Sequence, residues 1–456
     1  MKKTVCHSLK ANLLALLVVP LLLGSSCTVR RSLGLSTDTT ISQEATVQAA
    51  TVDLGLLQWR ERLDAVRSEV EILDGIPASL DPDKPSPDAI YRNGHVYGSA
   101  ILLPMGELKG KQKQPLLYYR VRAYDLEGNP VGSYSQMQPV SGSLQKVTRN
   151  APVPRSSMDD NGSELLYPVY AYTGNPGATQ YEVEVTDHRP ENPNGTAPSR
   201  YRVFAQTTKL TDLYDEKPRI GTYYWRVRGM DDAGNPMGEW SEAQKFTTVP
   251  KGDIKVGIYG DSISHGGGHL SYSPVDYVYS YSHYLGFRTI NLSQSGDTSA
   301  MMLERFDRDV PAFRLKYLLI MGGTNSLRAG VPAEDVIQDL EAIGEKARER
   351  GITPIYLTLP PINPANIDKA FDEPTYENWR QSFAQVNDYI RSRDHIDVAA
   401  QFDEQKDLPT ELALDGIHGD WNMKQIMAQA INTAMAGKER TCPGNRTGSF
   451  DIIFLD

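Results

Sequence analysis

Short apolar segments alternate with amphipathic segments from residue 252 onward, and this alternation restricts the fold more than any other feature. Two of the amphipathic segments, residues 332–350 and 376–390, carry apolar residues three or four positions apart, as in helices buried on one face. The apolar segments have the length of strands, at residues 254–260, 288–292, 317–321, 353–359 and 395–400. Strands that alternate with helices predict a parallel sheet covered by helices, in which functional groups collect at the carboxyl ends of the strands.

The chain before this region contains an internal repeat. Residues 118–130 are echoed by residues 224–236, and each copy continues through a glycine to an aromatic–serine pair. A second match, residues 69–72 against residues 182–185, lies upstream in the same order. Within the repeat the side chains alternate with a period of two, and an Asp-x-x-Gly-Asn-Pro turn comes next. This pattern is typical of antiparallel β-sandwiches.

We therefore predict two β-sandwich modules, at residues 51–142 and 143–250. The second copy of the repeat, residues 224–228 (Tyr-Trp-Arg-Val-Arg), resembles the penultimate strand of fibronectin type III modules, and Trp240-Ser241 resembles the Trp-Ser pair of the same modules. The resemblance implies two fibronectin III-like modules. Residues 59–73 of the first module leave a helix open as an alternative to a strand.

Residues 1–26 resemble a bacterial lipoprotein signal peptide. Three lysines precede an apolar run at residues 11–23, which is too short for a permanent membrane helix but suits a signal peptide. The run ends in Leu-Gly-Ser-Ser before Cys27, and in such signals the cysteine is acylated and becomes the first residue of the mature chain. The alternative is an ordinary secretory signal in which Cys27 is incidental. We expect residues 27–50 to form a tether, and the protein to be lipid-anchored in the cell envelope.

Four short polar blocks stand at the ends of predicted strands or just before the last predicted helix. They are Gly-Asp-Ser-Ile-Ser at 260–264, Ser-Gly-Asp at 295–297, Gly-Gly-Thr-Asn at 322–325 and Asp-Gly-Ile-His at 415–418. Each block alone is a weak signal, but together and in this order they resemble the SGNH or GDSL hydrolase superfamily. The resemblance implies a flavodoxin-like three-layer α/β domain with serine esterase activity. We place this domain at residues 251–437, followed by a tail at 438–456.

The chemistry of acyl transfer suggests a role for each block. Ser262 is the candidate nucleophile, and a serine hydroxyl needs an adjacent base to remove its proton. His418 is the candidate general base and acid because imidazole titrates near neutrality, and Asp415, three residues earlier, orients it. The resemblance implies an oxyanion hole made by the backbone N–H groups of Ser262 and Gly296 and the side-chain amide of Asn325. Taken singly, Ser262 would be interpreted as a helix N-cap, and His418 could be a surface histidine.

Several side chains near these blocks are candidates for substrate contact. His265 and His269 flank three glycines, which would break a helix that chelates zinc, so we expect a loop that shapes the pocket and no metal site. Tyr272 and Tyr277 belong to a tyrosine-rich segment whose rings either stack on sugars or pack in the core as part of a helix. Trp421, three residues after His418, is a candidate for the wall of the acyl or sugar site.

The predicted function is hydrolysis of carboxylic esters, with an acetylated glycan or another small ester as substrate and no cofactor. We favour a carbohydrate O-acetylesterase. The alternatives are a lysophospholipase or general short-chain esterase, and a non-catalytic glycan-binding lipoprotein. The chain has 47 Lys and Arg residues against 57 Asp and Glu, a net charge of -10, which disfavours electrostatic binding to the phosphate backbone of nucleic acids. The predicted partners are therefore the ester substrate and, through the lipid anchor, a membrane.

Overall fold

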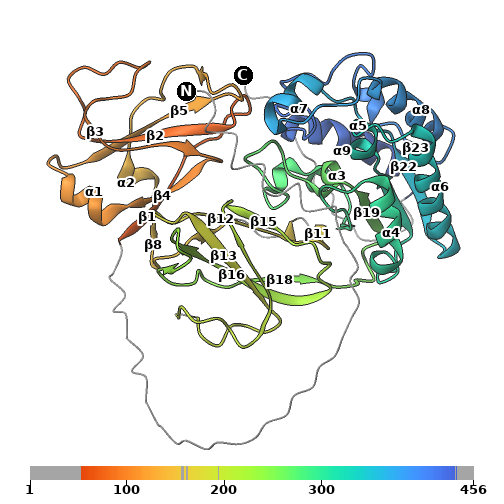
Figure 1. The fold of residues 1–456 in the computed structure, drawn as a ribbon, viewed down its shortest axis with the longest axis horizontal. Helices are drawn as coiled ribbons and strands as arrows, with labels where there is room; N and C mark the ends of the chain where they lie inside the picture. Colours follow the sequence, from red (N-terminus) through yellow and green to blue (C-terminus); the bar gives the residue numbers. More distant parts are fainter. Residues whose placement is uncertain (1–52, 156–158, 161–162, 194, 437, 439–456) are drawn as a thin grey trace, which may run out of the picture. The chain divides into compact units, whose positions relative to one another are not determined.

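The computed structural model describes residues 53–155, 159–160, 163–193, 195–436 and 438 (Figure 1). The predicted signal peptide, the tether with Cys27 and all but one residue of the predicted tail lie outside these residues. The described residues all belong to one structural unit. Within the described part of the chain, none of the helices combines the length and apolar character needed to cross a bilayer.

The first module consists of two antiparallel sheets with short helices at their edges. One sheet has the strand order β4-β1-β8, and the other has the order β3-β2-β5-β6 with β7 also paired to β5. Residues 67–73, for which a helix was an alternative, lie in β2. The elements are β1 Leu54–Gln58, β2 Arg67–Asp74, β3 Ala89–Val96, β4 Ala100–Pro104, α1 Met105–Lys111, β5 Leu117–Tyr124, β6 Pro130–Val131, β7 Gln138–Pro139, α2 Val140–Ser143 and β8 Leu144–Val147.

The second module repeats this arrangement. Its sheets have the orders β15-β12-β9 and β14-β13-β16-β17, with β18 also paired to β16, and a cluster of buried aromatic and branched side chains lies between them. The β-rich character predicted for both modules is confirmed. The elements are β9 Val153–Pro154, β12 Val169–Thr173, β13 Gln180–Thr186, β14 Arg202–Thr208, β15 Asp212–Tyr214, β16 Gly221–Met230, β17 Pro236–Met237 and β18 Gln244–Thr248.

The repeat in the sequence corresponds to a repeated buried ion pair. Glu71 in β2 lies opposite Arg120 in β5, and their side chains meet at 2.8 Å. Glu184 in β13 likewise lies opposite Arg226 in β16, at 2.8 Å. All four side chains are buried, so each charge depends on its partner. The aromatic residue of the aromatic–serine pair covers the arginine in each module, with Trp240 doing so in the second.

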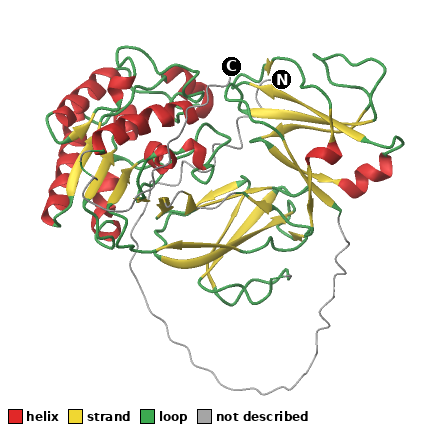
Figure 2. Ribbon diagram, turned by 180° about the vertical axis from the view of Figure 1, so that it is seen from behind, coloured by secondary structure: helices red, strands yellow, loops and turns green. Residues whose placement is uncertain are grey.

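The remaining strands form one sheet with the order β10-β11-β20-β19-β21-β22-β23, in which every neighbouring pair from β11 to β23 is parallel. The predicted parallel sheet is therefore confirmed. Figure 2 shows helices flanking its strands; α6 packs beside α4 and α8, and α9 packs on η1 and η2. The elements are β19 Val256–Gly260, α3 Ser262–His265, η1 Tyr277–Tyr279, η2 Tyr281–Tyr284, β20 Thr289–Asn291, α4 Ser299–Asp309, β21 Tyr317–Met321, α5 Thr324–Arg328, α6 Ala333–Glu349, β22 Thr353–Leu357, α7 Pro364–Phe371, α8 Trp379–Arg391, β23 His395–Ile396, η3 Ala399–Gln401 and α9 Trp421–Met435.

One edge of the parallel sheet comes from the chain before the second module's β12. Strand β10 (Asp159–Asp160) pairs with β11 (Ser163–Leu165), and β11 runs parallel to β20. Tyr167, two residues after β11, is buried in the core of the parallel sheet, and its hydroxyl donates to Asp309 at 2.6 Å. A segment that the sequence analysis counted with the second sandwich thus extends the sheet that carries the polar blocks.

Candidate active site

The turn that carries Ser262 is tight and needs a glycine before it. Strand β19 ends at Gly260, where an added Cβ would lie 2.2 Å from the carbonyl oxygen of Met321 in the neighbouring strand. Asp261 caps α3, and its carboxylate accepts the backbone N–H of Ile263 at 3.0 Å. Ser262 is therefore the first residue of a helix that begins directly at the carboxyl end of a central strand.

Ser262, His418 and Asp415 form a continuous chain of hydrogen bonds although 156 positions separate the serine from the histidine. The Nε2 atom of His418 lies 2.8 Å from the Oγ atom of Ser262, and its Nδ1 atom lies 2.9 Å from Asp415 Oδ2. A carboxylate only accepts hydrogen bonds, so Nδ1 carries the proton and Nε2 is free to accept one from the serine. This is the tautomer that a general base requires.

Asp415 is held as a carboxylate by its surroundings. Its Oδ1 atom accepts the backbone N–H groups of Ile417 at 3.0 Å and His418 at 2.8 Å. Burial by itself raises the pKa of Asp415, but the charge of His418 and these hydrogen bonds outweigh it, so the pKa lies below its usual value. The anion is therefore available to stabilise an imidazolium at His418.

The two other blocks approach each other at the ends of β20 and β21. Gly296 has φ +88°, and a Cβ there would meet no atom within 4 Å, so the residue is glycine for its backbone conformation. The amide Nδ2 of Asn325 donates to the backbone carbonyl of Asp297 at 2.9 Å. An amide nitrogen has two hydrogens, and this bond uses one, which leaves the other for an oxyanion.

Arg305 in α4 ties these strand ends together, and the sequence analysis did not identify it. Its buried guanidinium donates to the carbonyl oxygen of Gly260 at 3.1 Å and to that of Leu292 at 2.6 Å. It also donates to the carboxylates of Asp297 at 2.5 Å and Asp309 at 3.0 Å. The available signal was the charge pair at positions 305 and 309 on one helix face, which by itself is indistinguishable from a surface ion pair.

Lys424 is a second residue that the sequence analysis missed. It lies in the first turns of α9, is fully buried, and donates from Nζ to the carbonyl oxygen of Ile263 at 3.1 Å. Burial lowers its pKa to about 8, against the charges of Asp415, Asp261 and Asp420, which raise it. Lys424 therefore stabilises the turn that carries Ser262 through this hydrogen bond.

The histidines after the nucleophile block have different surroundings. The backbone N–H of Ser295 donates to His265 Nδ1 at 3.2 Å, and His265 Nε2 meets the carbonyl oxygen of Tyr167 at 2.8 Å. Burial lowers the pKa of His265 to about 4, so the ring is neutral. Both ring nitrogens have hydrogen-bond partners inside the protein. This geometry does not support the predicted substrate contact of His265. His269 is 3% exposed, and neither ring nitrogen has a hydrogen-bond partner among the described residues.

The aromatic candidates lie in two places. The tyrosine-rich segment forms two short 3-10 turns rather than the α-helix considered above, and Tyr272 stacks on Tyr279 with ring centroids 4.2 Å apart. Tyr277 is half-buried in the first of these turns. Trp421 is also half-buried and begins α9. Phe371, which the sequence analysis did not name, contacts the ring of His418 edge-on at 6.2 Å.

The comparisons with known proteins concern this part of the chain. Residues 258–420 match the GDSL-like Lipase/Acylhydrolase family. Similar solved structures include a GDSL-like lipase from Bacteroides thetaiotaomicron, with 20% identity over 41% of this chain and 89% of that one and a TM-score of 0.33. A lipase/acylhydrolase from Enterococcus faecalis has 20% identity over 41% and 96% of the two chains and a TM-score of 0.32. A catalytic mutant of an acetylxylan esterase from Geobacillus stearothermophilus has 20% identity over 41% and 95% and a TM-score of 0.31.

No curated protein sequence matches the chain. The family match begins within β19, just before Ser262, and ends two residues after His418. Residues 258–420 therefore form a GDSL-like hydrolase domain, and the protein is a carboxylic ester hydrolase.

Proposed function

We propose that the protein is a serine esterase that removes acetyl groups from carbohydrates through an acyl-enzyme on Ser262. The single observation that carries this proposal is the chain of hydrogen bonds at 2.8 and 2.9 Å from Ser262 through His418 to Asp415. Together with the family match, it supplies a nucleophile, a base in the correct tautomer and a buried anion.

The proposed reaction has two halves. Ser262 Oγ attacks the ester carbonyl while its proton passes to His418 Nε2, and the backbone N–H groups of Ser262 and Gly296 and the amide of Asn325 stabilise the oxyanion. The carbon–oxygen bond to the alcohol then breaks as His418 returns the proton to the leaving oxygen. In the second half His418 takes a proton from water, the hydroxide attacks the acyl-enzyme, and acetate leaves as Ser262 is reprotonated.

The carbohydrate part of the proposal draws on the aromatic side chains that follow the nucleophile in the sequence. Tyrosine rings and hydroxyl groups come soon after the nucleophile helix in the sequence, and such amphipathic rings suit sugar surfaces. We further propose that the two β modules are fibronectin III-like spacers and that acylated Cys27 anchors the protein in the cell envelope. Two linked modules would hold the hydrolase domain away from the lipid while it acts on a polymer.

The experiment is a set of hydrolysis assays with purified protein. We expect release of p-nitrophenol from p-nitrophenyl acetate, faster than from the octanoyl ester, and release of acetate from at least one acetylated polysaccharide. Ser262→Ala should abolish all three activities and leave the thermal melting temperature unchanged. Activity that survives in this variant would refute the assignment of the nucleophile, and preference for the octanoyl ester would favour a lysophospholipase or another esterase for longer acyl chains.

A further inference from the structure

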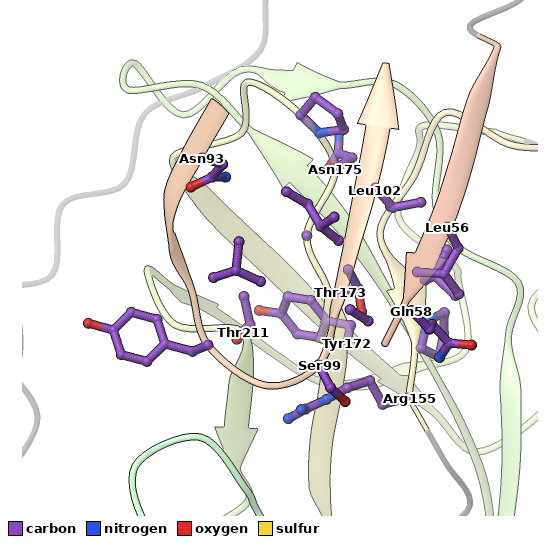
Figure 3. Close-up of a pocket in the computed structure, with 18 of the residues that line it drawn as sticks. Leu56, Gln58, Asn93, Ser99, Leu102, Arg155, Tyr172, Thr173, Asn175 and Thr211 are labelled. Carbon is purple, nitrogen blue, oxygen red and sulfur yellow. The ribbon is translucent and has the colours of Figure 1, made fainter. Parts of the chain in front are cut away.

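A large cavity lies where both β modules meet the tyrosine-rich segment of the hydrolase domain (Figure 3). Its volume is about 1090 Å³, slightly above the roughly 300–1,000 Å³ that is usual for ligand sites. The catalytic residues Ser262, His418 and Asp415 do not line it. The cavity is therefore a separate space from the site at which the ester reacts.

The lining of the cavity suits a neutral ligand with many hydroxyl groups. Figure 3 shows the side-chain amides of Gln58 and Asn93 from the first module at the cavity, and Asn175 from the second module also lines it. An amide side chain both donates and accepts hydrogen bonds. The exposed ring of Tyr97 and the half-buried ring of Tyr91 supply flat apolar surfaces to the same cavity. Sugars present the same combination of hydroxyl groups and apolar ring faces.

Two buried polar atoms of the cavity residues lack partners. Asn175 is 4% exposed, and its Oδ1 atom accepts no hydrogen bond from the described residues. The Nε atom of Arg155 is also buried and has no hydrogen-bond partner among them. An unsatisfied buried polar group costs about 1–3 kcal/mol, so a local movement that let a ligand hydroxyl reach either atom would remove a cost that the protein otherwise carries.

The charges at the cavity disfavour an anionic ligand. Arg155 from the second module and Asp276 from the hydrolase domain form a salt bridge at 3.4 Å, which offsets the positive charge of the arginine. The other carboxylates of the lining, Glu61 and Glu107, add negative charge. Phosphorylated ligands and acidic polysaccharides would be repelled at this place, and neutral sugars would not.

The cavity wall is directly connected to the turn that carries the nucleophile. The glycines just after α3 donate backbone N–H groups to residues of the wall, Gly267 to the carbonyl of Tyr279 and Gly268 to the carbonyl of Tyr272, both at 3.1 Å. The ring of Tyr272 contacts that of His269 at 5.0 Å. A ligand in the cavity would therefore touch a segment that begins a few residues after Ser262.

We propose that this cavity binds a neutral oligosaccharide segment of the substrate, away from the ester that is cleaved. The proposal rests on the proposed function, because it makes the cavity the place that selects the sugar chain. Affinity for a polymer then comes from the junction of the three parts of the protein, and the catalytic residues need to recognise only the ester and its immediate surroundings.

The test is isothermal titration calorimetry with Ser262→Ala protein, which does not consume ester substrates. The probes are xylohexaose, cellohexaose and mannohexaose without acetyl groups. We expect at least one of them to bind, and we expect Gln58→Ala or Tyr97→Ala to weaken that binding by about two- to tenfold each. The matched control is Gln206→Ala, an exposed glutamine on a strand of the second module that does not line the cavity.

Each outcome decides the proposal. Binding that is weakened by the two cavity variants and not by Gln206→Ala supports it. Absence of binding to all three hexasaccharides, or binding that both cavity variants leave intact, overturns it. The probes carry no ester, so their binding is independent of catalysis. If a hexasaccharide binds but wild-type protein releases no acetate from acetylated polysaccharides, the proposed acetylesterase function is overturned and the sugar site is retained.

Discussion

Replacing Asp415 with asparagine should separate catalysis from folding. The Oδ1 atom of Asp415 accepts two backbone N–H groups, at 2.8 and 3.0 Å, and an asparagine oxygen can keep both bonds only if its NH₂ group faces His418 Nδ1. The imidazole must then carry its proton on Nε2, pointing at Ser262, and it can no longer accept the serine proton. In other Ser-His-Asp sites this exchange costs about 10⁴-fold in kcat, or about 5 kcal/mol in the activation barrier.

The assay is steady-state hydrolysis of p-nitrophenyl acetate together with urea denaturation. Because Asp415→Asn keeps all three hydrogen bonds at the site, we expect its free energy of unfolding to change by less than about 2 kcal/mol. Asp415→Ala should also lose activity but be less stable, since it leaves two buried N–H groups without an acceptor. A loss below about tenfold in kcat for Asp415→Asn would refute the role of the carboxylate in setting the tautomer.

Three further predictions concern buried residues that stabilise the fold. Gly260→Ala places a methyl group 2.2 Å from a carbonyl oxygen of β21, so we expect a loss of about 1–3 kcal/mol in urea denaturation and loss of activity, with Gly286→Ala as an innocuous control. Burial lowers the pKa of Lys424 to about 8, so between pH 8 and 10.5 the unfolded chain binds this proton and the folded protein does not. The free energy of unfolding, relative to that of Lys424→Met, should therefore rise by about 3 kcal/mol over this range. Parallel pH profiles of the two proteins would contradict this. Glu184→Gln leaves the charge of Arg226 buried without its counter-ion and should cost about 3–5 kcal/mol, and a cost below 1 kcal/mol would show that the pair is not needed.

The periodic parts of the fold were predictable because burial dictates their sequence pattern. Residues 332–350 carry an apolar stripe and form α6, and the apolar segment at 317–321 matches β21. The repeat predicted equivalent strands, which are β5 and β16, and the second match corresponds to β2 and β13. Strand β11 was not predictable, because Ser163–Leu165 has no strand pattern of its own and becomes a strand by pairing with β20.

The candidate site was predictable where a motif carries the chemistry. Ser262, Asp415 and His418 stand in short recognisable blocks, and their proximity follows from the alternation of strands and helices. Arg305 and Lys424 were missed because their role depends on which backbone carbonyls they reach in space, and no spacing in the sequence reveals that. His265 was assigned to the substrate from its position in the sequence, whereas its burial and its two hydrogen bonds are properties of the folded chain.

The most direct test of the central claim is covalent labelling of the nucleophile. A fluorophosphonate reacts with a serine hydroxyl only when a base has activated it. We predict a single adduct by intact-protein mass spectrometry, located by peptide mapping on Ser262, and no adduct when His418 is replaced by alanine. An adduct on another residue, or labelling of Ser262 that persists without His418, would contradict the account.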